Sequence, residues 1–428
     1  MPVKKTAIVW VKTNLRLRDN ECLSKALAEN DLVIPFYCLD RQLFSTSQYG
    51  FKKAGNFRFK FLKESLQQFD NDLQSVGSRL VLLHGIPEKE ICKFAKEQNA
   101  NVVYAEKEVA PEELGTQKKV ADELSKLNCT YLTFECRNLL HSADLPFRLS
   151  ALPEVFTDFR KQVENALLVR PVLPRPSYIR SASTPAPDWA LFDKHIATDA
   201  ENDPRATLHF QGGSEAAHQR LNHYFYKTKA VSSYKVTRNG MVGEGYSSKF
   251  SPWLALGCIS AREIYEALKH YEDHYGANGS TYWFVFELLW RDYFGFCMEK
   301  NAKRYFSRLG DLRSTNGLSQ WIEGKTGQSF IDANMTELKL TGFMSNRGRQ
   351  NVASYLCNDL HVDWRYGAAY FEQQLIDYDV CNNWGNWAYL AGVGNDPRPN
   401  RYFDIDKQAA AYDPDGVFQR LWLNTPHT

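Results

Sequence analysis

The sequence predicts an α/β domain followed by an all-helical domain, and three observations carry this prediction. Short apolar runs alternate with helical patterns over the first third of the chain, a proline-rich stretch then interrupts the alternation, and beyond it only helical patterns occur. The length of 428 residues suits two or three domains, and the 43% hydrophobic share is enough for their cores. We expect an α/β domain with a doubly wound, parallel, five-stranded sheet over residues 1–136, a connector over 137–205 and an all-α domain over 206–428.

Five β-branched or aromatic runs predict the strands of the sheet, at 6–11, 31–39, 79–83, 101–105 and 130–134. They are largely apolar, as is typical of parallel strands that are buried on both faces. Helical patterns separate them, at 20–29, 54–76, 87–98 and 111–127. In the second of these, the apolar residues fall on one stripe, which consists of Phe59, Leu62, Leu66, Phe69 and Leu73.

Prolines dominate the later part of the expected connector. They include Pro171, Pro174 and Pro187, and they predict a long segment that lies over the surface. After this segment, stripes rich in Tyr, Phe and Trp predict the helices of the second domain, at 213–226, 260–274, 281–301, 346–359 and 366–378.

Composition excludes several classes of protein. A net charge of +2 excludes a histone-like polycation, so any nucleic acid must be met by a local basic patch. The nine cysteines are scattered without a CxxC pair, which is typical of reduced thiols in a cytoplasmic protein and predicts neither a disulfide framework nor a metal site. No apolar run reaches the roughly 18 to 20 residues of a membrane span, so we expect no membrane. Residues 12–16, after the first strand, lack a GxGxxG motif and predict no dinucleotide site there.

The helical stretch 282–293 carries polar groups among apolar ones. Glu287, Trp290 and Arg291 are spaced i, i+3 and i+4, so they share one face of the helix. A carboxylate and a guanidinium on such a helix are costly to bury unless each is paired. Spacing alone favours an internal Glu287–Arg291 ion pair over a functional role.

Two later segments also combine hydrogen-bonding groups in an unusual way. In residues 341–351, Asn346, Arg347 and Arg349 are typical of a site that binds a phosphate or an acidic cofactor. Arg-Gly-Arg is, however, also common in solvated loops. Residues 377–387 hold two Asp, three Asn and two Trp, which are poor material for a core or a helix. This composition favours a functional role for the second segment.

Residues 245–253 lead into an apolar helix. Their hydroxyls and backbone N–H groups suit a pyrophosphate. Ser251 before Pro252 suits an ordinary N-cap equally well, so both interpretations stay open on the residues alone.

Together these segments resemble the photolyase/cryptochrome family, most closely its DASH cryptochrome branch. The motifs lie in residues 9–20, 246–257, 286–293, 341–351 and 375–398. They follow the family's order and cover nearly the whole chain. The resemblance implies a flavoprotein that absorbs blue light.

The implied cofactor is FAD, held in a U-shape inside the helical domain. Arg349 paired with Asp377 would lie beside the flavin ring, and Asn383 near its N5 would favour the reduced, anionic flavin. The FAD-binding set that the resemblance implies is Tyr234, Ser247, Ser248, Lys249, Phe250, Ser251, Glu287, Arg291, Asn346, Arg349, Asp377, Asp379 and Asn383.

The implied activity is light-driven repair of cyclobutane pyrimidine dimers. In the family, the excited reduced flavin passes an electron to a dimer flipped out of the DNA, and the electron returns after the dimer splits. Glu287 would hydrogen-bond the dimer, and Trp290 and Tyr389 would form its apolar walls, with Asn383 completing the catalytic set. The implied DNA contacts are Arg347, Gln350, Lys249 and Arg398.

The resemblance also implies an electron-transfer chain and an antenna. Trp387 and Trp364 match the first two tryptophans of the family's photoreduction chain, but residues 310–316 hold no tryptophan where the third is expected, which leaves Tyr305 or another aromatic residue. Glu108 matches the position that contacts a 5,10-methenyltetrahydrofolate antenna. A carboxylate suits the N–H groups of a pterin edge, although a Glu in a charged loop is usually solvated.

Two positions bear on the substrate. Tyr389 and Gln350 match the DASH pattern, whereas Trp and Met are typical of double-strand photolyases; they imply a preference for dimers in single-stranded or looped DNA, where flipping costs less. None of the ten histidines falls in the chemistry-bearing segments, which disfavours (6-4) repair. We expect a monomer. Two alternatives stay open: a blue-light photoreceptor that binds FAD and DNA but signals without significant repair, and a light-independent flavin protein.

Overall fold

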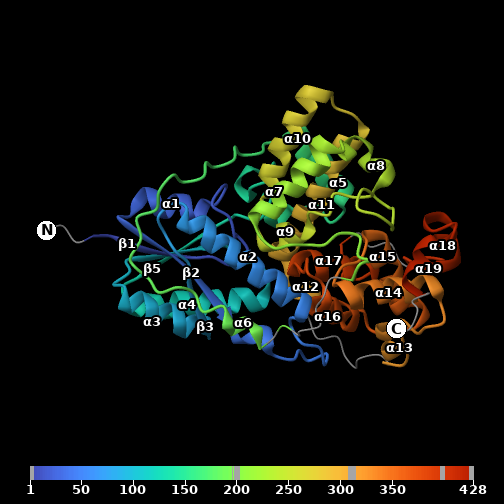
Figure 1. The fold of residues 1–428 in the computed structure, drawn as a ribbon, viewed down its shortest axis with the longest axis horizontal. Coiled ribbons are helices and arrows are strands. Elements are labelled where there is room, and N and C mark those ends of the chain that lie inside the picture. The colour runs from blue at the N-terminus through green and yellow to red at the C-terminus, as the bar shows by residue number, and fades with distance from the viewer. Residues whose placement is uncertain (1–3, 195, 197–202, 307–314, 396–400, 424–428) are drawn as a thin grey trace.

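The computed structural model describes the chain except for residues 1–3, 195, 197–202, 307–314, 396–400 and 424–428. A layered sheet domain lies at one end of the molecule and a cluster of helices at the other (Figure 1). Between α5 (Phe156–Asn165) and α6 (Ala190–Asp193), the chain runs as an extended segment along the outside of the sheet domain.

The five predicted strands form one parallel sheet in the order β3-β2-β1-β4-β5, which confirms the expected fold class. They are β1 (Thr6–Trp10), β2 (Leu32–Asp40), β3 (Val81–Gly85), β4 (Val102–Glu106) and β5 (Thr130–Phe134). The strand order reverses between β1 and β4. In parallel α/β sheets, the carboxyl ends of the strands at such a reversal border a crevice that is suited to a ligand.

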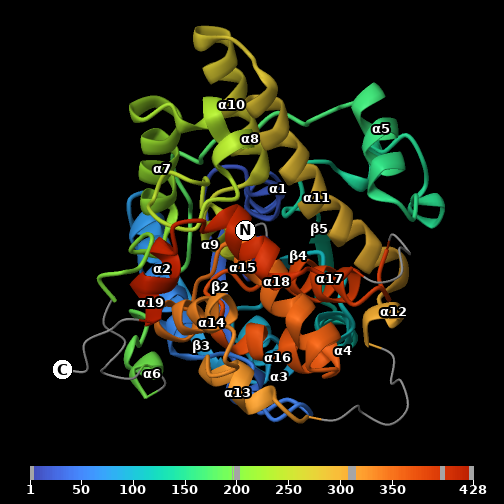
Figure 2. The ribbon, with the colours of Figure 1, turned by 90° about the vertical axis from the view of Figure 1, so that its right-hand side faces the viewer.

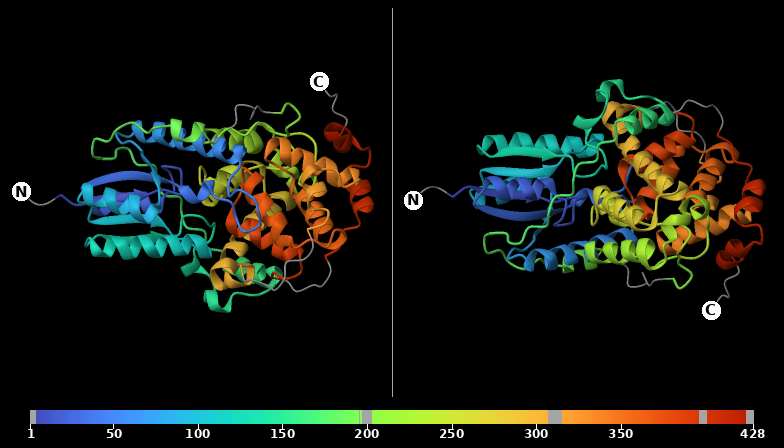
Figure 3. Two further views of the ribbon diagram at one scale, coloured as in Figure 1. Left: turned by 90° about the horizontal axis from the view of Figure 1, so that it is seen from below. Right: turned by 90° about the horizontal axis from the view of Figure 1, so that it is seen from above.

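Helices cover both faces of this sheet (Figure 3). Ala7 and Val9 share one core with α1 (Glu21–Glu29) and α2 (Asn56–Gln74). Ile8 and Trp10 point the other way, into the core under α3 (Pro87–Glu97) and α4 (Pro111–Lys126). This division follows from the alternation of side chains along a strand, and it explains why β1 is apolar throughout.

The second domain is built from helices around α11 (Gly279–Asn301), which runs between α10 (Ala261–Tyr275) and α12 (Lys303–Phe306) in Figure 2. The predicted helix 366–378 runs from Trp364 to Gln374. Within the described residues, seven helices of this domain were not predicted, and they are α8 (Tyr234–Thr237), α12 (Lys303–Phe306), α13 (Leu318–Glu323), α14 (Ser329–Thr341), α17 (Val380–Leu390), α18 (Ile405–Tyr412) and α19 (Val417–Leu423). The remaining helices of this domain are α7 (Ser214–Asn222), α9 (Ser251–Leu256), α10 (Ala261–Tyr275), α15 (Asn346–Ser354) and α16 (Trp364–Gln374).

Part of the expected connector belongs to the core of the helical domain. Helix α5 buries Phe156, Phe159 and Val163, which share one face. Phe156 stacks on Trp290 of α11 with 3.6 Å between ring centres. Within the expected connector, therefore, only the proline-rich part that follows α5 runs over the surface.

The motif at residues 14–20 joins the two domains. Arg16 donates to the carbonyls of Gly257 and Cys136, each at 2.9 Å, and Arg262 of α10 donates to Asp19 at 2.9 Å. Gly257 has a φ of +66°, and a Cβ there would lie 1.9 Å from the carbonyl oxygen of Thr13. Its close approach sets the position of α9 against the turn after β1.

Candidate functional site

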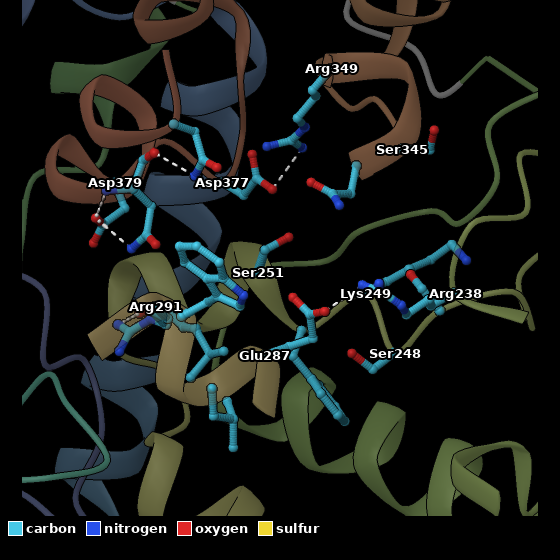
Figure 4. Close-up of a pocket in the computed structure, with 18 of the residues that line it drawn as sticks. Arg238, Ser248, Lys249, Ser251, Glu287, Arg291, Ser345, Arg349, Asp377 and Asp379 are labelled. Atoms are coloured by element: carbon cyan, nitrogen blue, oxygen red, sulfur yellow. Dashed lines mark hydrogen bonds and ion pairs between the residues drawn. The ribbon is translucent and has the colours of Figure 1, made fainter. Parts of the chain in front are cut away.

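A cavity of about 400 Å³ lies inside the helical domain, among α8, α9, α11, α15 and α17. Side chains from these elements converge on it in Figure 4. Of the residues expected to bind FAD, all but Asn383 line it; Trp290, Gln350 and Tyr389 line it too. Sequence segments that lie up to 155 residues apart, from Tyr234 to Tyr389, thus meet at one place.

Arg220 of α7 shapes one wall of the cavity. Its guanidinium donates to the carbonyls of Glu244, Ser247 and Ser248 at 2.8, 3.1 and 3.0 Å. Arg220 thus holds the backbone of this segment, whose residues Ser247 and Ser248 line the cavity. Helix α9 begins at Ser251 without a side-chain cap, so the N-cap interpretation of Ser251 is wrong and its hydroxyl is left for the cavity.

Lys249 turns inward. It is 3% exposed and has a φ of +59°, and its ammonium donates to the carbonyl of Glu244 at 3.0 Å. Burial, and then the nearby Arg220, lowers the pKa of Lys249 to about 6. An amine in this position faces the cavity and not the surface, so the expected contact between Lys249 and DNA is not supported.

Glu287 and Arg291 do not pair with each other, so the ion pair favoured by their spacing is wrong. Glu287 forms an ion pair with Arg238, which lies at the C-terminal end of α8, and accepts a hydrogen bond from its guanidinium. Arg291 instead donates to the carbonyls of Arg137 and Leu254 at 2.7 and 3.3 Å. Burial raises the pKa of Glu287 even though Arg238 favours its ionised form.

Aromatic rings form the wall beside Glu287. The rings of Trp290 and Tyr389 meet edge to face with 5.7 Å between centres. Phe156 stacks on one face of Trp290, and the guanidinium of Arg401 lies 3.6 Å from the centre of the Tyr389 ring. These contacts hold both rings in place as walls of the cavity.

The opposite wall carries a buried ion pair. Arg349 of α15 donates to Asp377 Oδ2 at 2.8 Å and to the carbonyl of Met344 at 2.9 Å. Asp377 Oδ1 is buried and has no hydrogen-bond partner among the described residues. A buried carboxylate oxygen without a partner is costly, so this atom fits an N–H donor on a bound group. The arrangement fits the edge of a flavin ring.

The Asn- and Trp-rich segment forms helix α17, although its composition predicted poor helix material. Asp379 caps this helix by accepting from the backbone N–H and the side chain of Asn382, at 2.9 and 3.0 Å. Burial alone would raise the pKa of Asp379, but Arg137 and Arg291 outweigh it and hold the pKa below its usual value. Asn383, on the next turn, donates to the carbonyl of Ala368 and lines an adjoining cavity of about 100 Å³ together with Asp377.

A second cavity, of about 220 Å³, lies where the strand order reverses. Lys12 and Glu108 follow β1 and β4 and form an ion pair of 2.6 Å there, and Glu108 is 8% exposed. Burial, and then Glu108, raises the pKa of Glu113 beside them to about 7. Leu256 and Tyr378 of the helical domain close the cavity, so Glu108 lies in an interdomain pocket and not in a solvated loop.

The two expected electron-transfer tryptophans are both buried. Trp387 contacts Phe371 and Trp321 with 5.1 and 6.2 Å between ring centres. Trp364 meets Trp384 edge to face at 5.8 Å. Tyr305, the suggested substitute for a third tryptophan, donates to Asn395 at 2.6 Å instead. Trp384 is thus the tryptophan in ring contact with Trp364 in the described part of the chain.

Arg347 and Arg398 were also expected to contact DNA. Arg347 is partly buried, donates to Asn239 at 3.2 Å and lies 4.3 Å from the centre of the Tyr412 ring. Arg398 lies outside the described residues.

Sequence reasoning missed residues that act through distant partners. Arg137, Arg220 and Arg238 each contact the site from another element. Asn382 and Asn386 were part of a segment expected to be functional, but no role was assigned to them. Their helical spacing of four residues is the signal that could have placed both on one face of α17.

Two absences hold for the described residues. No helix among them is long and apolar enough to span a bilayer. Within the same residues, no cluster of three or more His, Cys, Asp or Glu side chains is arranged to hold a metal ion.

Comparison with known proteins gives matches over nearly the whole chain. A family model described as DNA photolyase matches residues 7–177, and one described as the FAD binding domain of DNA photolyase matches residues 284–426. Cryptochrome DASH of Synechocystis sp. is 44% identical over 98% of this chain and 88% of its own, and that of Xenopus laevis is 46% identical over 97% and 82%. A crystal structure of a Synechocystis sp. cryptochrome is similar with a TM-score of 0.94 at 43% identity, covering 99% of this chain and 89% of that one.

Proposed function

Because the chain belongs to the photolyase/cryptochrome family and is a cryptochrome DASH homologue, we propose that it repairs cyclobutane pyrimidine dimers in single-stranded or looped DNA under blue light. The observation that carries the proposal is that Glu287, Trp290 and Tyr389 line the same cavity as the Arg349–Asp377 pair. Dimer-facing groups and flavin-facing groups therefore share one space.

The flavin-facing wall suits FAD. Asp377 Oδ1, which has no hydrogen-bond partner among the described residues, would accept from the flavin, while Arg349 donates to the other oxygen of the same carboxyl. Ser247, Ser248 and Lys249 would contact the phosphates. When bound and reduced, FAD supplies the light-excited electron that splits the dimer, so repair needs no general base.

The dimer-facing wall suits a flipped pyrimidine pair. Trp290 and Tyr389 offer faces and edges on which bases stack, and Glu287 offers a carboxyl to their polar edges. Gln350 of α15 lines the same cavity, and Arg347 lies three residues earlier on the same helix; both would contact the DNA. Unpaired DNA flips at lower cost, which suits a wall built from the smaller Tyr389.

The second cavity suits an antenna. The carboxyls of Glu108 and Glu113 could accept from the N–H groups of a pterin, so we infer 5,10-methenyltetrahydrofolate as its ligand. The monomeric state and the cytoplasmic location expected from the sequence stay predictions.

One experiment separates repair from signalling. The FAD-loaded, reduced protein is illuminated with a dimer-containing single-stranded oligonucleotide, and the return of thymine absorbance is followed. We expect recovery in the wild type and a large loss of rate in Glu287→Ala. FAD-loaded protein that restores no absorbance would reject the repair function and favour the photoreceptor.

A further inference from the structure

A tyrosine lies at the end of the tryptophans that are expected to carry electrons. Trp364 meets Trp384 edge to face with 5.8 Å between ring centres, and the indole N–H of Trp384 donates to the hydroxyl of Tyr378 at 3.3 Å. Trp387, the first of the expected tryptophans, packs against the helix of Trp364, since a Cβ at Gly367 would lie 2.2 Å from the Trp387 indole. Aromatic groups therefore lead from Trp387 across α16 to Tyr378.

The Tyr378 hydroxyl has an acceptor for its proton. It is hydrogen-bonded to the carboxyl of Glu372 in the last turn of α16, and this bond favours the ionised form of Glu372. An ionised carboxyl only accepts, so the phenol is the donor. The indole of Trp384, the phenol and the carboxyl thus form a series in which each group donates to the next.

The surroundings of the pair keep the phenol protonated at rest. Burial is the largest influence on both groups, and it raises the pKa of Tyr378 and that of Glu372. The guanidinium of Arg58 lies 4.4 Å from the centre of the Tyr378 ring. A pH above neutrality favours the carboxylate of Glu372. The charged side chains that face the pair are the cations Lys53 and Arg58 and the α4 carboxyls Glu112 and Glu113.

We propose that Tyr378 is the last electron donor within the protein during flavin photoreduction and that Glu372 accepts its phenolic proton. One electron passes from the phenol to the oxidised indole of Trp384, which becomes neutral with its N–H bond intact. The O–H bond of Tyr378 breaks, and an O–H bond forms on the Glu372 carboxylate. An external thiolate then gives one electron to the tyrosyl radical, and the proton returns from Glu372 to the phenol oxygen. The resulting thiyl radical couples with a second one to form a disulfide.

The position of Tyr378 suits a last donor. Its side chain is partly buried and lines the interdomain cavity of about 220 Å³, through which a small thiol can approach it. Trp384 is 5% exposed, so a positive charge on its indole is costly to keep. The proposed step removes that charge together with the charge of Glu372 and leaves neutral groups, which a buried site favours. The inference rests on the light-reducible FAD of the proposed function but not on DNA repair.

Time-resolved spectra of the complete, FAD-loaded protein without DNA test the assignment. After a blue flash at about pH 8, we expect the tryptophan radical of the wild type to give way to a tyrosyl radical. Ring-deuterated tyrosine should narrow the electron paramagnetic resonance signal of that radical. Tyr378→Phe should lose the signal and reduce the flavin several-fold more slowly with thiol. A tyrosyl signal that persists in Tyr378→Phe would overturn the inference.

Glu372→Gln tests the proton acceptor, because an amide oxygen accepts the hydrogen bond but not the proton. The yield of tyrosyl radical should fall several-fold in this variant. In the wild type the yield should decrease as the pH is lowered, since protonated Glu372 no longer accepts, and Glu372→Gln should remove this dependence. A wild-type yield in Glu372→Gln would overturn the role of the carboxyl.

Tyr49→Phe is the matched control. The Tyr49 ring lies 6.0 Å from the Trp384 ring, but its hydroxyl accepts a hydrogen bond from Gln48 at 3.0 Å. We therefore expect the tyrosyl radical to persist in Tyr49→Phe, and its loss there would overturn the assignment to Tyr378.

Trp384→Phe tests the route, because Tyr378 also lines the cavity that adjoins the flavin-facing wall. We expect this variant to lose the tyrosyl signal, and a signal that survives would overturn passage through Trp384. FAD absorbance checks that each variant is folded. If Tyr378→Phe holds no FAD, Trp384→Phe and Glu372→Gln carry the measurement.

Infrared spectra in the dark give a readout that needs no photochemistry. The C–O stretch of Tyr378, obtained as the difference between wild type and Tyr378→Phe, should shift in Glu372→Gln; an unshifted band would overturn the hydrogen-bonded pair. A wild type that forms the Tyr378 radical but repairs no dimer would reject the repair function and support this inference. Repair by chemically reduced wild type that forms no tyrosyl radical would overturn the inference alone.

Discussion

Arg349 and Asp377 form an ion pair of 2.8 Å that joins α15 to the loop before α17. The Asp377 side chain is only 2% exposed, so removing Arg349 would leave a buried carboxyl without its ion-pair partner. The pair closes one end of the main cavity and leaves Asp377 Oδ1 for a ligand.

This pair makes FAD retention sensitive to Arg349. Arg349→Ala should weaken FAD binding by about 10- to 100-fold, since a hydrogen bond to a charged group is worth about 1.5–3 kcal/mol. Arg347→Ala removes a guanidinium two residues away that does not line the main cavity, so it serves as the control. The measurement is the FAD dissociation constant without DNA, and equal losses in both variants would contradict the assignment.

Lys249 should make FAD binding depend on pH. Its pKa of about 6 leaves a neutral amine in the empty site at pH 8. A pyrophosphate favours the ammonium, so binding takes up a proton and FAD affinity should fall by up to about tenfold per pH unit above pH 6. Lys249→Met should flatten this dependence, as measured by flavin fluorescence between about pH 6 and 9.

The neighbouring carboxyl of Glu337 supplies the control for this dependence. Burial raises the pKa of Glu337 to about 8, and ionisation of Lys249 promotes loss of its proton, which cancels part of the uptake. Glu337→Gln should therefore steepen the pH dependence. An unchanged slope in Lys249→Met would show that Lys249 does not face the phosphates.

The ring contact between Trp364 and Trp384 predicts a route for photoreduction. Trp364→Phe should slow flavin reduction by an external thiol under blue light, and Trp384→Phe should slow it less, because Trp364 would still accept the charge. Trp253→Phe is the control, since Trp253 is also buried but donates to the carbonyl of Gln211 at 2.9 Å and has its ring contacts with Phe61 and Phe210. The rate of flavin photoreduction is measured by transient absorption. A wild-type rate in Trp384→Phe would exclude this route.

Substrate choice should depend on the wall formed by Tyr389 and Gln350. Stacking a base on an aromatic side chain is worth about 1–3 kcal/mol, comparable to the cost of flipping from a duplex. Tyr389→Trp combined with Gln350→Met should therefore raise repair of duplex DNA relative to single strands at matched salt. Equal repair of both by the wild type would defeat the argument.

The Glu108 carboxyl should be needed for an antenna. Folate-loaded wild type should show a near-ultraviolet band that Glu108→Ala loses, because the pterin loses its acceptor. Glu112→Ala is the control, since Glu112 lines the same cavity but is paired with Lys53 near the surface. A folate-saturated wild type without the band would refute antenna binding.

The sequence by itself determined the order of the elements and the chemical content of the site. Strand and helix periods are local, so each element of the sheet domain could be predicted to within two residues at its ends: β5 lies at Thr130–Phe134 as predicted, and β3 lies at Val81–Gly85 against a predicted 79–83. The segments that carry the acidic, basic and aromatic groups of the main cavity could likewise be named in advance, because their residue types are unusual for a core.

The tertiary structure alone decided which partner each charge takes. Glu287 pairs with Arg238, 49 residues earlier, and not with Arg291 one turn along its own helix. Lys249 turns inward toward Glu244, and an Asn-rich segment becomes helix α17 because Asp379 caps it and its neighbours bury it. These outcomes depend on how distant helices pack, and packing overrides both spacing and propensity, since burial makes each unpaired charge too costly to leave.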